Sequence, residues 1–323
     1  MAAVLVVLAA CSSGARGGPV TSGDDAGAVS PASVAPVQTR PFADDSPLNS
    51  PISDDPTIDP QSNAMISGMF DGDGVPIANI DEFGFGIYDA QASTPKYTVT
   101  CRYNWGACPF DGHEVPLTEA MEAPRGSDAQ LAVIDWETRT VYEMWQYRWN
   151  DGEPSAAWGS VLSVDGSGLT QPPDGIGHSR GSGFSVLAGV VRRYEIQQGR
   201  IDHALEFSTN RCKMNEFREP AFQTDGKVDE PNAVPEGARL QLDPSVDVDS
   251  LPDLTDAERI VARALQEYGA YAVDCGGSPM AIGFERTPSG APSPYPNVGI
   301  THDYMPLGGI PTDKLRVLAS WDS

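Results

Sequence analysis

His203 is the residue whose type and setting point most directly to proton transfer. In the segment 200–207, alternate positions carry Ile201, His203, Leu205 and Phe207. Such alternation is typical of a strand with one buried face, so the imidazole is expected to point the same way as three core side chains. Glu195 lies nearby in sequence, and an acid beside an imidazole orients and charges it. His203 is predicted either to accept a proton from a substrate or to be a hydrogen-bonded core residue.

Basic residues near His203 suggest one reaction for it. A polysaccharide lyase needs a base and a cation that neutralises the carboxylate of a uronic acid. Arg192 and Arg239 are the candidates for that cation, and Glu195 is placed with them as a substrate-binding residue.

Three carboxylates are candidates for a different reaction, glycoside hydrolysis, which needs two carboxyl groups facing each other across a cleft. Asp135 and Glu143 are on successive strand-like segments joined by a turn at 136–139. Asp274 stands at the end of another predicted strand, just before two glycines. The alternative for Asp135 is that its side chain caps the turn.

Aromatic residues are dense between positions 136 and 158. Alternation places Trp145, Tyr147 and Trp149 on one face of a single predicted strand. Three aligned aromatic side chains form either a wall of the core or a platform for the apolar faces of sugar rings. Trp145 is therefore a candidate for substrate binding.

The glycine-rich segment 177–184 is predicted to be a loop. It is either a simple surface connection or the rim of a cleft. In the second case His178 and Arg180 would face the ligand.

Composition and motifs exclude several functions. The formal net charge is -24, which repels phosphate backbones, so no nucleic-acid partner is expected. The sequence contains no Gly-x-Ser-x-Gly, phosphate loop, His-Glu-x-x-His or dinucleotide-binding glycine motif. No metal-binding spacing of cysteines and histidines occurs either. No cofactor and no metal are therefore predicted.

The N-terminus resembles the signal of a bacterial lipoprotein. Residues 1–10 are apolar and too few to span a bilayer core, which takes roughly 20 residues as a helix. Leu8-Ala9-Ala10-Cys11 resembles a lipobox, in which the cysteine receives a lipid and becomes the mature N-terminus. This resemblance implies export and anchoring to the outer face of a lipid bilayer through Cys11.

The remaining chain divides into a stalk and a folded part. Residues 11–40 lack aromatic side chains and are rich in small and polar residues, which predicts a disordered stalk. Residues 41–323 are predicted to form a single β-rich domain. In an exported protein its cysteines can oxidise, and Cys101 and Cys108 are close enough for a small disulfide loop. Cys212 and Cys275 are the remaining pair.

The fold class follows from turns and alternation. With 33 Gly and 28 Pro, long helices are excluded almost everywhere, and short strands alternate at 131–134, 140–145, 158–164 and 239–243. One helix is predicted near 256–268, with a capping box at Thr255 and Glu258 and a terminating Gly269. Tyr268 belongs to its buried stripe. The expected class is mainly β, a jelly-roll-like β-sandwich with one packed helix.

Several blocks resemble a broad group of exported bacterial proteins of actinobacterial type. They are 42–49, 132–135, 140–143, 183–195, 199–205, 237–239 and 263–274. The resemblance covers most of the chain from about residue 41 and implies a single extracellular domain. In that group a histidine often precedes the Asp135 block, where this chain has residues 128–130 as Asp-Ala-Gln.

These observations lead to two expectations of function. The first is a cell-surface lipoprotein that acts on an extracellular polysaccharide, as a glycoside hydrolase or a polysaccharide lyase. The second is a non-catalytic carbohydrate-binding or envelope-associated lipoprotein.

Overall fold

The computed structural model describes residues 40–72 and 74–322. The predicted signal peptide 1–10, the predicted lipidation site Cys11 and almost all of the predicted stalk 11–40 lie outside the described residues. The described residues form one compact unit. Among the described residues, no helix has both the length and the apolar character needed to cross a membrane.

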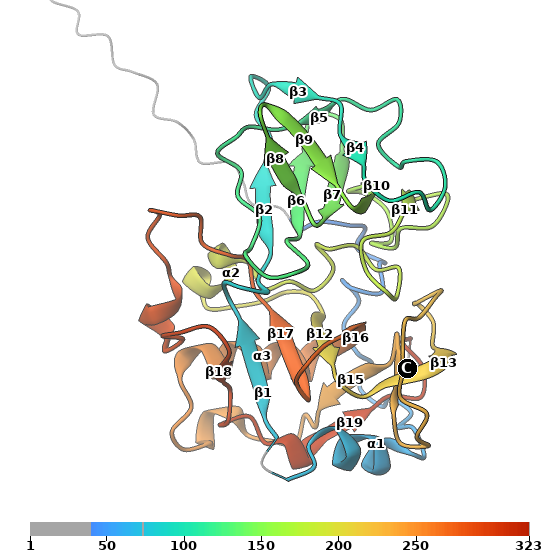
Figure 1. Ribbon diagram of the computed structural model, residues 1–323. Helices are drawn as coiled ribbons and strands as arrows, with labels where there is room; N and C mark the ends of the chain where they lie inside the picture. The colour runs from blue at the N-terminus through green and yellow to red at the C-terminus, as the bar shows by residue number, and fades with distance from the viewer. Residues whose placement is uncertain (1–39, 73, 323) are drawn as a thin grey trace, which may run out of the picture. The chain divides into compact units, whose positions relative to one another are not determined.

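The described chain is mainly β, as predicted, and two sheets dominate it (Figure 1). The larger sheet has seven strands, in the spatial order β18 (Met305–Pro306), β1 (Pro76–Asn79), β17 (Met280–Gly283), β12 (Leu205–Thr209), β16 (Ala270–Cys275), β15 (Arg239–Leu242) and β19 (Leu315–Val317). The second sheet has five, in the order β11 (Gly175–Gly177), β10 (Trp158–Ser163), β7 (Thr140–Trp145), β6 (Leu131–Asp135) and β2 (Gly86–Asp89).

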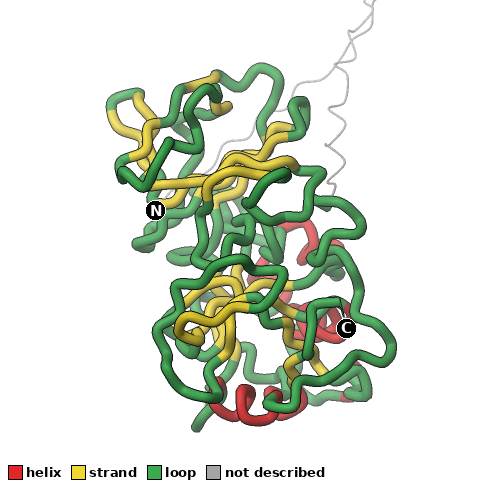
Figure 2. The backbone as a smooth tube through the Cα atoms, turned by 90° about the vertical axis from the view of Figure 1, so that its right-hand side faces the viewer, coloured by secondary structure: helices red, strands yellow, loops and turns green. Residues whose placement is uncertain are grey.

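Three small sheets complete the strands. They pair β13 (Cys212–Phe217) with β14 (Val234–Glu236), β3 (Lys96–Tyr97) with β5 (Val115–Pro116), and β9 (Glu153–Ala156) with both β4 (Thr100–Cys101) and β8 (Arg148–Asn150). In Figure 2 the strands gather in two groups, with long loops between them. These loops, rather than the strands, supply much of the site described below.

Both main sheets are mixed. The pairs β1–β17, β12–β16 and β2–β6 are parallel, whereas the hairpin of β6 and β7 is antiparallel. A jelly roll is built from antiparallel strands. The structure therefore supports the predicted β-rich class without supporting that particular topology.

Three α-helices are described: α1 (Ser62–Met69), α2 (Arg193–Gln198) and α3 (Asp256–Glu267). The prediction near 256–268 is confirmed by α3, which begins with the predicted capping box. The Glu258 backbone N–H donates to Thr255 Oγ1 at 3.2 Å, and the Thr255 N–H donates to Glu258 Oε2 at 2.8 Å. The expectation of only one helix is wrong, because α1 and α2 are too short for helical periodicity to stand out in sequence. Short 3-10 turns occur at Val248–Ser250, Tyr295–Val298 and Thr312–Lys314.

The predicted strand over 200–207 is wrong in its first half. Gly199, with φ 78°, ends α2 in a left-handed conformation, and β12 begins only at Leu205. Ile201 and His203 are nevertheless buried. The alternation in sequence thus reflects tertiary burial of an irregular segment and not the pleat of a strand.

The predicted single strand of aromatic residues is also wrong. β7 ends at Trp145, Gln146 turns the chain with φ 51°, and β8 begins at Arg148. The aromatic side chains therefore separate. Trp149 meets Tyr97 edge-on with ring centroids 5.0 Å apart, whereas Trp145 joins a different group.

Two disulfides are present, each with Cα atoms 5.7 Å apart: Cys101–Cys108 confirms the predicted small loop, and Cys212–Cys275 joins a pair that the sequence left open. Disulfides form and persist in oxidising compartments, so the protein belongs outside the reducing cytosol.

The core packs against both main sheets. One apolar cluster covers the seven-stranded sheet beneath α3, and it includes the fully buried Phe207 and Phe284. The residues that line this cluster from α3 are those of the predicted apolar stripe, Ile260, Val261, Ala264 and Leu265. Tyr268, also predicted to be core, is buried in the neighbouring cluster with Phe184 and Tyr271. Burial of each such large side chain contributes about 2 kcal/mol.

Candidate functional site

Two adjoining cavities, of about 640 and 390 Å³, form the candidate site. They share the lining residues Asp128, Gln130, Arg180, Asp274 and Cys275, and we call the combined depression the cleft. The loop before β6 supplies the first two of these residues, the loop after β11 supplies the third, and the end of β16 supplies the last two. The cleft is thus built from segments that are far apart in the sequence.

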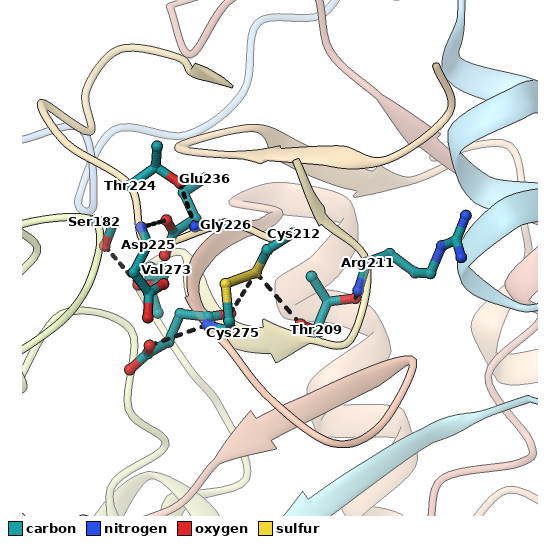
Figure 3. The surroundings of a disulfide bond; sticks show 11 residues. Ser182, Thr209, Arg211, Cys212, Thr224, Asp225, Gly226, Glu236, Val273 and Cys275 are labelled. Atoms are coloured by element: carbon teal, nitrogen blue, oxygen red, sulfur yellow. Dashed lines mark hydrogen bonds between the residues drawn. A yellow bond between two sulfur atoms is a disulfide. The ribbon is translucent and has the colours of Figure 1, made fainter. Parts of the chain in front are cut away.

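Three carboxylates converge at the cleft. Asp225, Glu236 and Asp274 each have an oxygen within 4.8 Å of the others. Figure 3 shows Asp225 and Glu236 beside the disulfide that joins Cys212 to Cys275, and we call the three carboxylates the acid trio. Asp274 comes from β16, Glu236 ends β14, and Asp225 is on the loop between β13 and β14.

Backbone geometry holds the trio together. The Asp225 N–H donates to Glu236 Oε2 at 3.0 Å, and the Cys275 N–H donates to Asp274 Oδ1 at 3.0 Å. The Cys212–Cys275 disulfide ties the start of β13 to the end of β16, beside Asp274. Gly181 packs against the trio, since a Cβ there would lie 2.5 Å from Asp225 Oδ1 and 3.2 Å from Glu236 Oε1.

The environment favours the protonated form of two members of the trio. Burial raises the pKa of Glu236 to about 7, and hydrogen bonds from its neighbours only partly oppose this. Burial also raises the pKa of Asp274 well above its usual value. Arg180 lowers that pKa, while the nearby carboxylates of Asp225 and Glu236 raise it further. Two carboxyl groups of the trio, those of Glu236 and Asp274, are thus biased toward holding a proton.

The trio is also a set of hard oxygen donors. Its three residues fall short of the six to eight oxygens that Ca²⁺ takes. The other group with metal-ligand geometry, Cys212, Glu236 and Cys275, has both of its sulfur atoms in a disulfide. We therefore interpret the trio as a cluster of carboxyl groups in which Glu236 and Asp274 favour a proton.

A buried ion pair lies next to the trio. Arg180 Nη1 and Glu206 Oε2 are 3.0 Å apart, and their side chains are 1% and 4% exposed. Arg180 Nη2 also donates to the Val186 carbonyl at 3.1 Å, and its guanidinium lies 4.7 Å from the centroid of the Phe85 ring. The Arg180 charge is therefore neutralised inside the protein.

An aromatic wall borders the smaller cavity, formed by Trp105, Trp145 and Trp158. Trp105 stacks on Trp145 with centroids 5.9 Å apart and an interplanar angle of 20°, and its centroid is 5.8 Å from that of Trp158. Trp105 is 57% exposed. It is carried by the loop that the Cys101–Cys108 disulfide closes, so the covalent bond limits where this indole can lie.

Several buried polar atoms along the cleft have no hydrogen-bond partner within the protein. They include Asn79 Oδ1, Gln130 Oε1, Trp158 Nε1, Arg180 Nε and Ser278 Oγ, all from lining residues, together with Glu236 Oε1 of the trio. Buried polar groups almost always find a partner in protein or water. Their concentration at one place is what a site for a polar ligand would show.

Four of the residues singled out from the sequence line the cleft. Asp274 and Trp145 line it as described, and His178 lines the smaller cavity. Burial lowers the pKa of His178, which therefore favours its neutral form. Arg180 lines both cavities, but it is buried within the protein and not at a rim.

His203 lies elsewhere, since neither cavity includes it. Its Nε2 is 3.0 Å from Glu195 Oε1, and its Nδ1 is 2.9 Å from the Ala204 carbonyl oxygen. Burial lowers the pKa of His203, but Glu195 more than offsets this and raises it overall. The contact with Glu195 agrees with the prediction. Both residues are buried, which fits the core alternative.

The two arginines that were predicted to bind a uronate carboxylate instead make contacts within the fold. Arg192 Nε pairs with Glu285 Oε2 at 2.8 Å, and both side chains are buried. Arg239 donates to the backbone carbonyls of Tyr268, Trp321 and Ser50. Neither arginine lines the cleft.

Asp135 and Glu143 do not face each other. In the β6–β7 hairpin Glu143 is opposite Ala132, three residues from Asp135, so the two carboxylates point to opposite faces. Asp135 Oδ1 accepts from the N–H groups of Glu137 and Thr138, which is the turn-capping alternative.

Glu143 is fully buried beneath the loop that forms one wall of the cleft. It accepts hydrogen bonds from Ser160 Oγ at 2.6 Å and from the Val186 N–H at 2.8 Å, and also from Ser185 Oγ. Ser160 in turn contacts Ser179 Oγ, at 3.0 Å, in the lining of the smaller cavity. Glu143 therefore does not line the cleft, but its hydrogen bonds hold in place segments next to the cleft lining.

The sequence reasoning missed Asp128, Asp225, Glu236 and Trp105. Asp225 and Glu236 are in loop-rich sequence with no periodic pattern, so no local signal marks them. Trp105 had a usable signal, because an aromatic residue enclosed by a small disulfide loop is held at the surface.

Comparison with known proteins adds no name to this arrangement: no family model, no curated protein and no solved structure matches the chain.

Proposed function

We propose that this protein binds an extracellular glycan in the cleft and hydrolyses a glycosidic bond there. The observation that carries the proposal is the junction of an exposed tryptophan wall with three carboxylates, two of which favour protonation. Indole faces stack on the apolar faces of sugar rings. Hydrolysis then needs one carboxyl group that holds a proton and one that does not.

The roles within the trio follow from exposure. Asp274 lines both cavities and has a raised pKa, so it is the proposed general acid that protonates the leaving oxygen. Asp225 is the exposed member and lines the smaller cavity, so it is the proposed nucleophile or base. Glu236 is fully buried and acts as a positioning residue that keeps the Asp274 proton in place.

The separation within the trio favours a retaining reaction. Retaining enzymes place their two carboxyl groups about 5–5.5 Å apart, whereas inverting enzymes leave about 6.5–9.5 Å for a water molecule. The trio oxygens lie within 4.8 Å of one another. Attack by Asp225 on the anomeric carbon would give a glycosyl ester, which water would then cleave with Asp274 as the base.

A lyase is less well supported. His203 and the arginines first considered for it, Arg192 and Arg239, are buried away from the cleft. A carbohydrate-binding protein without catalysis is the second candidate, since the exposed Trp105 could bind a sugar ring without help from the trio.

The proposed location is the outer surface of the cell. The two disulfides support an oxidising environment. We also propose that the protein is anchored to the lipid bilayer through Cys11, and mass spectrometry of the mature N-terminus tests this.

Reaction of the full chain with a panel of neutral, uronic and amino polysaccharides tests the hydrolase. We expect new reducing ends without the absorbance of unsaturated uronates, and loss of that activity in Asp274→Asn and Asp225→Asn. Asp229→Asn, a neighbouring exposed carboxylate outside the cleft, is the matched control. Glycan binding without cleavage would favour the non-catalytic candidate, and absence of binding would refute the proposal.

A further inference from the structure

The charge of the cleft indicates which glycans it can accept. Its lining carries five carboxylates and one guanidinium, namely Glu82, Asp128, Glu206, Asp225 and Asp274 against Arg180. Glu206 already neutralises that guanidinium at 3.0 Å in a buried pair. Among the described lining residues, no cation is therefore left to receive an anionic ligand.

Asp128 is the carboxylate best placed to meet a ligand. It is half-buried, lines both cavities and accepts a hydrogen bond from Trp145 Nε1 at its Oδ1, at 3.1 Å. Its neighbours on this wall are the stacked rings of Trp145 and Trp105. The Asp128 carboxylate meets Trp145 at the N–H edge of the indole, and a carboxylate has acceptor capacity for an ammonium in addition to that N–H.

The unpartnered polar atoms of the cleft include acceptors as well as the donors Trp158 Nε1 and Arg180 Nε, so acceptors are present for the donors of a ligand. Asn79 Oδ1 and Gln130 Oε1 are acceptors from buried residues that line the cleft, and Glu236 Oε1 is an acceptor in the adjoining trio. An ammonium group offers three donors and no acceptor. Uronic, sulfated and phosphorylated sugars would add negative charge to a lining in which carboxyl groups outnumber cations.

From the charge of the lining and the position of Asp128 beside the Trp145 indole we infer that the cleft selects glycans with free amino groups, with an ammonium bound at Asp128 against the Trp105–Trp145 wall. The inference rests on the proposed function, since it names the substrate class for the same cleft. It predicts that a polymer of unacetylated amino sugars binds better than its N-acetylated counterpart.

Binding of three oligosaccharides of equal length to the full chain tests this inference. The probes are deacetylated chito-oligosaccharide, its fully N-acetylated form and oligogalacturonate, measured by calorimetry at mildly acidic pH. We expect the deacetylated form to bind about tenfold more tightly than the N-acetylated form, because a charge-assisted hydrogen bond contributes about 1.5–3 kcal/mol. Oligogalacturonate should bind weakest, and added salt should reduce the preference.

The variant Asp128→Asn tests whether Asp128 is the residue that binds the ammonium group. Asparagine can still accept from Trp145 Nε1, so the wall should be kept while the charge is removed. The variant should lose the tenfold preference and bind the N-acetylated form as before, while Asp229→Asn should keep the preference. Thermal unfolding of both variants checks that they fold as the parent chain does.

The outcomes separate the two proposals. Equal or tighter binding of the N-acetylated form or of oligogalacturonate would overturn the amino-sugar inference and leave the glycan cleft in place. A preference that survives in Asp128→Asn would overturn the assigned position. No binding of any of the three would overturn both the inference and the proposed function.

Discussion

Trp145 Nε1 donates a hydrogen bond to Asp128 Oδ1 at 3.1 Å. This contact joins the last residue of β7 to the loop that precedes β6, and it links the aromatic wall of the cleft to one of its carboxylates. The indole and the acid therefore hold one another in position. Changes at either residue should affect both stacking and charge.

Removing the exposed indole should weaken ligand binding without unfolding the protein. Trp105 is 57% exposed, so Trp105→Ala loses little buried surface. Loss of one stacking face is expected to reduce glycan affinity about three- to tenfold, as measured by calorimetry. Ile176→Ala is the control, since Ile176 is 46% exposed and lies outside both cavities. Unchanged affinity in Trp105→Ala would show that the wall does not contact the ligand.

Breaking the buried ion pair of Arg180 and Glu206 should destabilise the fold strongly. Glu206→Gln leaves the Arg180 guanidinium buried without its partner charge, which costs about 3–5 kcal/mol. Urea unfolding should show this loss. Asp165→Asn, which breaks the exposed pair of Arg139 and Asp165, should leave the midpoint where it was. A small effect of Glu206→Gln would mean that water reaches Arg180.

Glu236 should make stability depend on pH. Its folded pKa of about 7 lies above the ordinary value of 4.5, so the folded state binds more protons than the unfolded state between these values. The contribution of Glu236 is therefore full at low pH and is lost as pH rises through about 7. Relative to Glu236→Gln, the wild-type free energy of unfolding should fall by about 3 kcal/mol across this interval.

Denaturant titrations at several pH values measure this difference. Glu137→Gln, at an exposed turn position, should run parallel to wild type throughout. Parallel curves for Glu236→Gln and wild type would contradict the protonated state assigned to the trio.

The two disulfides should have different consequences when removed. Cys101 and Cys108 are 7 residues apart, so Cys101→Ser with Cys108→Ser should cost about 2–3 kcal/mol and also reduce glycan affinity by releasing Trp105. Cys212 and Cys275 are 63 residues apart, and their loss should cost about 4 kcal/mol. Guanidinium unfolding and calorimetry on both double variants compare the effects. Full affinity in the first variant would mean that the bond does not position Trp105.

His203 is expected to contribute to the stability of the fold and not to ligand binding in the cleft. His203→Ala removes the partner of the buried Glu195 carboxylate, so the melting temperature should fall while glycan affinity is kept. Because the folded pKa of His203 is raised, its stabilising effect is present at low pH and is lost as pH rises through the folded value. Loss of glycan cleavage in a well-folded His203→Ala would restore the lyase hypothesis.

Sequence patterns predicted the elements whose signals are local. The capping box at Thr255 and Glu258 located α3, the strands β6, β7, β10 and β15 appeared where alternation placed them, and β16 appeared where a strand was expected before the glycines that follow it. The Cys101–Cys108 disulfide was predicted from its short spacing, whereas the sequence left open whether Cys212 and Cys275 pair. The capping box, strand alternation and the short spacing of Cys101 and Cys108 are local signals. They therefore predict structure independently of the tertiary arrangement.

The cleft was only partly predictable for the opposite reason. Asp274 was chosen from its position at a strand end and Trp145 from its place in the aromatic segment, and both line the cleft. Asp225 and Glu236 meet Asp274 only because β14 pairs with β13 and the Cys212–Cys275 disulfide brings β13 to β16. Arg192, Glu195 and His203 attracted notice as charged residues close in sequence, but burial commits them to internal pairs.

The residue at position 181 indicates, in an alignment of homologous sequences, whether the acid trio can form. A methyl group at this position would lie 2.5 Å from Asp225 Oδ1, and the exposed aspartate would have to swing away from its two companions. Any homologue with alanine or a bulkier side chain at that column should have abandoned the three-way arrangement, even if it retains all three acids. Homologues with glycine at this position can therefore hold the three acids together, whereas homologues with a larger residue there are expected to keep the fold without this arrangement.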